Sequence, residues 1–132
     1  MASIEGELRT FVLASAGSVV SYISSAMYLI EAPQEVTLPY IVYTPISDPM
    51  EPVSFDHVNT RGPRYQFDIY SDNMGTLIAI ENALVSRLRW WQGSVGTLVC
   101  EHIDVVNMFK TRQEGTQVFR SIVDSIIVYN EG

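Results

Sequence analysis

Hydrophobic and polar residues alternate along residues 64–70, and the spacing then becomes helical. Tyr65, Phe67 and Ile69 share one face of this stretch, with polar or charged residues between them. Such alternation predicts a β-strand with one face buried. The residues Ser71-Asp72-Asn73 supply a turn and a helix N-cap. The apolar stripe of the predicted helix that follows consists of Met74, Leu77, Ile80, Leu84, Val85 and Leu88.

The remaining segments predict layers that cover this strand and helix. A first helix is expected over Ser3–Ala16, with Glu5 and Glu7 near its positive end, and a short helical turn over Val19–Ser24. Further strands are expected at Met27–Ile30, Leu38–Thr44, Val95–Val106 and Gln117–Tyr129. The predicted fold is one α+β domain spanning residues 1–132. It has a mostly antiparallel sheet of four to five strands packed by two helices, in the order α-β-β-β-α-β-β.

The predicted strand Gln117–Tyr129 is expected to be the longest, and it is apolar on both faces. This pattern indicates a central place in the sheet or contact with another chain.

Two of the connections between predicted elements are unusual. Ser47–Pro63 is seventeen residues long and contains Met50, Val53, Phe55 and Val58, so it is expected to fold against a partner. Met108–Thr116 is predicted to be a polar connection.

The charge balance argues against a protein that grips nucleic acid. The net charge is −7, and only eight basic residues are scattered along the 132-residue chain. A binder of DNA or RNA needs a basic surface that displaces counterions from phosphates. An acidic surface still suits a channel through which DNA slides without sticking.

Cysteine use and hydropathy indicate the compartment. Cys100 is the only cysteine, which excludes an intrachain disulfide, and it is expected to be a buried small hydrophobic residue. The chain shows neither a signal peptide at its start nor an apolar run of about 20 residues that would span a bilayer. A soluble cytosolic product without membrane contact is therefore expected.

No catalytic, cofactor or metal site is predicted. Residues 54–57 place Ser54, Asp56 and His57 almost side by side, whereas a working triad brings such groups together from separate parts of a fold. His57 and His102 lack the spacing of metal ligands. No glycine loop suited to phosphate is present. An enzyme or ligand-binding domain is the alternative from another class, with Glu81 or His102 in a pocket.

Several charged residues interrupt apolar patterns and are candidates for interfaces. Glu81 lies within the helical stripe, either at its rim where it reaches water or paired with an arginine in the fold or across a subunit boundary. Arg120 and Asp124 form either a same-face ion pair or part of an interface or lumen lining. Trp90-Trp91 is either a lid on the core or a docking anchor. The predicted interface residues are Met50, Val53, Phe55, His57, Arg61, Arg64, Asp68, Glu81, Phe109, Lys110, Arg112, Arg120 and Asp124.

Three stretches resemble a known family. These are LPYIVYTPIS at 38–47, RGPRYQFDIYSDNMGTLIAIENALVSRL at 61–88 and VFRSIVDSIIVYNE at 118–131. They resemble the small tail completion proteins of long-tailed phages and prophages, also called tail terminator or tail-to-head joining proteins. MYLIEAPQ at 27–34 fits the same pattern. The resemblance covers almost the whole chain and keeps the order of elements.

The resemblance implies an α+β subunit of a hexameric ring on top of the tail tube. Such a ring stops tube polymerisation, presents a surface to the head connector and lets DNA pass through its lumen without specific binding. The implied partners are further copies of the chain, the tail tube protein and a head-closure or neck connector protein. The implied location is the tail or neck of a virion assembled in the host cytoplasm. The family has no catalytic motif to transfer, and a head-closure or neck protein on the portal side is the structural alternative.

Overall fold

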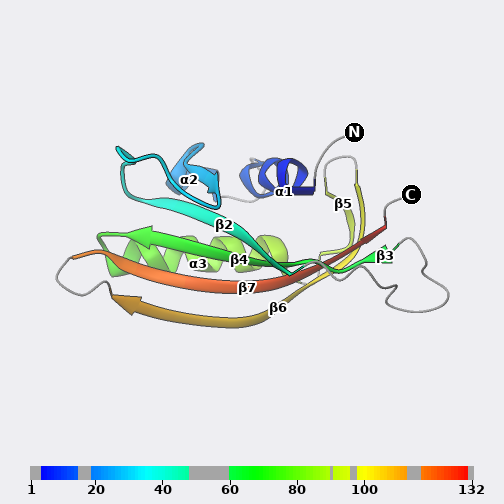
Figure 1. Ribbon diagram of the computed structural model, residues 1–132. Coiled ribbons are helices and arrows are strands. Elements are labelled where there is room, and N and C mark those ends of the chain that lie inside the picture. The colour runs from blue at the N-terminus through cyan, green and yellow to red at the C-terminus, as the bar shows by residue number, and fades with distance from the viewer. Residues whose placement is uncertain are drawn as a thin grey trace.

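The computed structural model describes residues 4–14, 19–47, 60–89, 91–95, 98–112 and 117–130. The helices are α1 (Ile4–Leu13), α2 (Val20–Ile23) and α3 (Met74–Leu88). The strands are β1 (Met27–Leu29), β2 (Tyr40–Ser47), β3 (Thr60–Arg61), β4 (Arg64–Ser71), β5 (Gly93–Val95), β6 (Leu98–Arg112) and β7 (Phe119–Asn130). The helices gather against one face of a curled sheet, which confirms the predicted α+β class (Figure 1).

The strands lie in the order β1-β2-β4-β7-β6-β5, and β3 pairs with β7 beyond the end of β4. The pairing of β1 with β2 is parallel, and all other pairings are antiparallel. β7 therefore lies between β4 and β6, which confirms the central place expected from its two apolar faces. β6 rather than β7 is the longest strand, with 15 residues against 12.

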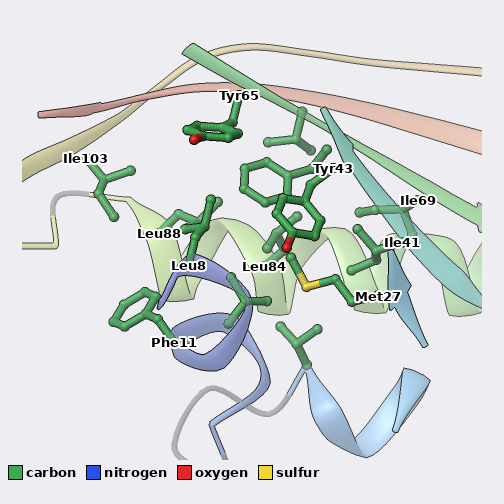
Figure 2. Close-up of a cluster of buried hydrophobic side chains, with 14 of the residues drawn as sticks. Leu8, Phe11, Met27, Ile41, Tyr43, Tyr65, Ile69, Leu84, Leu88 and Ile103 are labelled. Atoms are coloured by element: carbon green, nitrogen blue, oxygen red, sulfur yellow. The ribbon is translucent and has the colours of Figure 1, made fainter. Parts of the chain in front are cut away.

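One core fills the space between the helices and the sheet. α1 and α3 place their apolar stripes against the inward faces of the strands, and Met27 of β1 closes one end (Figure 2). Side chains alternate between the two faces of β4, and Tyr65, Phe67 and Ile69 on its inward face are buried, as predicted. The labelled residues of the core are Leu8, Phe11, Met27, Ile41, Tyr43, Tyr65, Ile69, Leu84, Leu88 and Ile103.

α3 begins where the sequence predicts. The side chain of Asn73 accepts a hydrogen bond from the backbone N–H of Thr76 at 3.0 Å, which satisfies one of the free donors of the first turn. Leu77, Ile80, Leu84 and Leu88 are fully buried. Met74, predicted in the same stripe, is exposed because the first turn extends past the edge of the core.

The main correction to the predicted elements concerns β6. The expected polar connection at Met108–Thr116 is wrong, since β6 continues to Arg112. The polar residues of this stretch were interpreted as a connection, but Met108 and Lys110 pair with Val123 and Ser121 of β7. β3 and β5 were also missed: Thr60–Arg61 lies within the predicted connection Ser47–Pro63, and Gly93–Val95 ends where the strand Val95–Val106 was expected to begin. Residues 48–59 of the predicted long connection lie outside the described residues.

Cys100 offers a test of this core. The residue is 2% exposed, and burial raises the pKa of its thiol from 9.0 to about 11. We expect the native protein at neutral pH to react with iodoacetamide about 100-fold more slowly than the urea-unfolded chain, because the reactive thiolate is that much rarer. Rapid labelling without unfolding would contradict this burial.

The same shift has a stability consequence with a definite sign. A raised pKa means that the folded state favours the neutral thiol, so the contribution is complete below pH 9 and is lost as pH rises to about 11. The variant Cys100→Ala lacks this group. Urea unfolding of both proteins at pH 8 and pH 11 is therefore expected to show a larger loss of stability in the natural chain.

Candidate interaction surfaces

The sheet face opposite the helices carries a charged network made of Arg64, Asp68, Arg120 and Asp124. Arg64 binds Asp124 and Arg120 binds Asp68, each with a nitrogen–oxygen distance of 3.1 Å. Both pairs cross diagonally between β4 and β7, since Asp124 stands opposite Gln66 and Asp68 stands opposite Ile122. The predicted pair between Arg120 and Asp124 is wrong. Four residues along one strand separate side chains by about 13 Å, too far for an ion pair.

The carboxylates of the charged network are the buried members. Asp68 is 6% exposed, whereas the side chain of Arg120 is 30% exposed. The side-chain amide of Gln66 donates to both oxygens of Asp68, at 3.0 and 3.2 Å. The guanidinium of Arg120 lies over the ring of Tyr70 at 5.7 Å, and Tyr70 stacks on Tyr40. The network is thus a fixed polar surface in which every charge has an opposite partner.

Glu81 ties α3 to the sheet from the other side. It is 5% exposed and accepts a hydrogen bond from the ammonium of Lys110 at 3.0 Å. The hydroxyl of Ser121 donates to its second oxygen. Glu81 therefore does not lie at a rim open to water, and it forms an ion pair within the fold. Its cation is the chain's single lysine rather than the expected arginine.

The outer edge of β6 is open. β5 pairs only with residues 98–100, and within the described ranges no strand pairs with the outer side of β6 beyond them. Val106, Met108 and Phe109 are exposed along this edge, Phe109 by 49%. A groove of about 160 Å³ separates the edge from the end of α3 and is lined in part by Val85 and Met108. Exposed apolar residues on a long strand edge are typical of contact with another chain.

The opposite edge of the sheet, at β1, is closed and hollowed. The outward carbonyl of Met27 accepts from Arg9 at 2.9 Å, and that of Leu29 accepts from the N–H of Glu31 at 2.8 Å. The N–H of Met27 donates to Ser25 at 2.8 Å. Beside this strand is a hollow of about 490 Å³, whose lining includes Arg9, Met27, Leu29, Glu31 and Tyr43. The two edges of the sheet therefore differ in both shape and backbone availability.

The comparison with protein families identifies the chain. A family model described as tail completion protein gp17 matches residues 9–130. The chain belongs to this family. A solved chain from a structure titled "Virion of native gene transfer agent (GTA) particle" has the same fold, with a TM-score of 0.76 at 12% identity over 98% of this chain and 99% of that one. No curated protein matches the sequence. This tail completion protein is a structural component of a virion tail.

The structure of the tail completion protein groups some predicted interface residues and separates others. Arg64, Asp68, Arg120 and Asp124 share the face away from the helices, while Glu81 and Lys110 meet beside α3. Phe109 and Arg112 are exposed on β6. Four predicted residues lie outside the described residues, as does the side chain of Arg61, whose backbone forms β3. These four are Met50, Val53, Phe55 and His57.

Trp91 supports the prediction of a lid on the core. Its ring packs on that of Phe11 with centroids 4.9 Å apart, and its indole N–H donates to the carbonyl of Ser94 at 3.2 Å. Arg87 lies over the Phe11 ring at 3.9 Å and donates to the Phe11 carbonyl. These contacts join α1 to the end of α3. Trp90 lies outside the described residues.

The alternative of a ligand pocket at Glu81 or His102 gains no support from the geometry of the tail completion protein. Neither residue lines the two hollows described above. His102 lies 3.5 Å from Asp104, and both side chains are well exposed. Among the described residues, no three side chains of metal-ligating type lie together. No helix in the described part of the chain has both the length and the hydropathy to cross a bilayer.

Proposed function

We propose that this tail completion protein assembles as a hexameric ring that caps the tail tube. In this role it ends tube polymerisation and provides the surface on which the head is joined. The observation that carries the proposal is the family match over residues 9–130. The partners are further copies of the chain, the tail tube protein and a head-closure or neck connector protein.

The two unlike sheet edges suit a ring. Closed rotational symmetry joins subunits through heterologous contacts, in which each copy uses two different surfaces. The β6 edge has exposed apolar side chains and the β1 edge has a hollow, so each copy offers two such surfaces. A dimer with twofold symmetry would pair each surface with itself.

The electrostatics suit passage of DNA through the ring. The chain has a net charge of −7, and the arginines of the charged network are held by Asp68 and Asp124. Arginines engaged in this way offer little to phosphate groups, whereas tight DNA binding needs cations that neutralise phosphates. DNA therefore slides through the lumen without specific binding.

The decisive experiment compares tails assembled with and without this protein by electron microscopy. Without it, we expect tubes of variable and excessive length that carry no heads. Adding the purified protein to growing tubes is expected to arrest them, and tails made with the protein present are the control. Headless tubes of normal length would place the protein on the portal side as a neck connector. Tails of normal length with heads attached would exclude both roles.

A further inference from the structure

We propose that the β6 edge of one copy docks into the hollow beside β1 of the next copy. This inference deepens the proposed ring and rests on it. It assigns the head-to-tail contact to specific side chains. The donor edge carries Phe109 on the face away from the helices and Met108 and Arg112 on the helix face. The acceptor surface consists of Leu29 and Glu31 with the hollow they line.

The first argument is position. β1 and β6 lie towards opposite ends of the strand order β1-β2-β4-β7-β6-β5. A rotation that brings the β6 edge of one copy onto the β1 edge of a second leaves the β6 edge of the second free for a third. Repetition of this contact closes into a ring when the rotation divides a full turn.

The second argument is shape. Met108 and Phe109 project from an exposed edge, and about half of the Phe109 side chain is open to water. The open hollow of about 490 Å³ has a mixed lining, in which Leu29, Ala32 and Pro33 accompany the charged residues Arg9 and Glu31. Removal of a large apolar side chain such as Phe109 from water into this hollow favours the contact. A projecting aromatic anchor in a pocket is the usual centre of a protein interface.

The third argument is the state of the backbone at β1. Three outward groups already have partners: the N–H of Met27 donates to Ser25, and the carbonyls of Met27 and Leu29 accept from Arg9 and Glu31. An incoming strand therefore finds few free groups with which to extend the sheet. The contact is accordingly formed by side chains entering the hollow rather than by continuation of the sheet from copy to copy.

The fourth argument is charge. Arg112 is exposed at the end of β6, on the face of the sheet opposite to Phe109. Glu31 lines the hollow, and Glu35 is exposed in the turn that follows. In a head-to-tail contact the arginine of one copy meets these carboxylates of the next.

Disulfide cross-linking tests this contact in the whole chain. The variant carrying both Leu29→Cys and Phe109→Cys is expected to yield a series of multimers on oxidation, up to the closed ring. Each single variant alone is expected to remain uncross-linked, and a mixture of the two single variants is expected to stop at dimers. The natural Cys100 is buried and contributes no background. The reaction is run on the isolated protein and on assembled tails.

A matched control uses another exposed residue of β6. Val99 is 62% exposed but lies ten residues from Phe109, about 33 Å along the strand. The variant with Leu29→Cys and Val99→Cys is expected to give no cross-link. Dimers formed by Phe109→Cys alone would establish a twofold contact and overturn the proposal. Rings or tails without cross-links in the Leu29 and Phe109 double variant would also overturn it.

These outcomes separate the contact from the proposed function. Multimers that do not arrest tube growth would retain the contact and reject the capping role. Arrested tubes without cross-linked multimers would retain the capping role and reject the contact.

Discussion

Replacing Arg120 with methionine is expected to lower the free energy of unfolding by about 3 kcal/mol. The change removes the cation that faces Asp68 at 3.1 Å and leaves a nearly buried carboxylate with only the amide of Gln66. The cost lies at the lower end for broken buried pairs because water reaches part of the Arg120 side chain. Urea unfolding followed by tryptophan fluorescence measures the effect as a lower midpoint at an unchanged slope.

The converse variant provides the control. Asp68→Asn is expected to cost about 1 kcal/mol, since the partly exposed guanidinium of Arg120 can be solvated instead. Asp68→Asn is also expected to recover most of the stability lost in the Arg120→Met protein, because it removes the unpaired charge. Equal losses in both single variants that simply add in the double variant would show that the pair is not coupled.

The variant Lys110→Met is expected to cost about 2–3 kcal/mol for the same physical reason on the other side of the sheet. Glu81 is 5% exposed and would keep only the hydroxyl of Ser121 as a partner. Glu81→Gln is expected to change stability by no more than about 1 kcal/mol, because its amide retains hydrogen bonding and Lys110 is 37% exposed.

The test is the difference between the free energies of unfolding of the two variants, measured by thermal or urea unfolding. A loss of stability in Lys110→Met no larger than that in Glu81→Gln would mean that Glu81 does not depend on its lysine.

Local patterns were sufficient to predict the centre of the fold. The alternation of Tyr65, Phe67 and Ile69 and the cap at Asn73 each depend on residues a few positions apart. The two apolar faces of β7 likewise indicated its central place, and the strand order confirms that place. These signals are properties of one element at a time.

The partners of the charged residues could not be predicted in this way. Lys110 lies 29 residues from Glu81, and Ser121 lies 40 residues from it. Which of them meets α3 depends on the register of β6 against β7, including irregularities near residues 100–102 and 105–107. Register is set by the whole sheet, and a shift of one residue would turn Lys110 to the opposite face.

The interface candidates also differ in whether a local sequence pattern could predict them. The sequence indicated Phe109 as a contact residue, and the structure places it on an open edge. The hollow beside β1 had no sequence signal, since Arg9, Leu29 and Tyr43 come from three separate elements. Pockets made by such combinations appear only when the tertiary structure is known.

The place of β7 in the sheet has a consequence for synthesis on the ribosome. β4 and β6 do not pair with each other, and both depend on β7 for an antiparallel partner. β7 leaves the ribosome after both of them, and its pairing with β4 joins residues that lie 48 to 62 positions apart in the chain. Contacts of such long range form slowly, so the nascent chain holds two separate halves of a sheet until residues 119–130 emerge. A translation product cut short before this strand lacks the element that joins those halves.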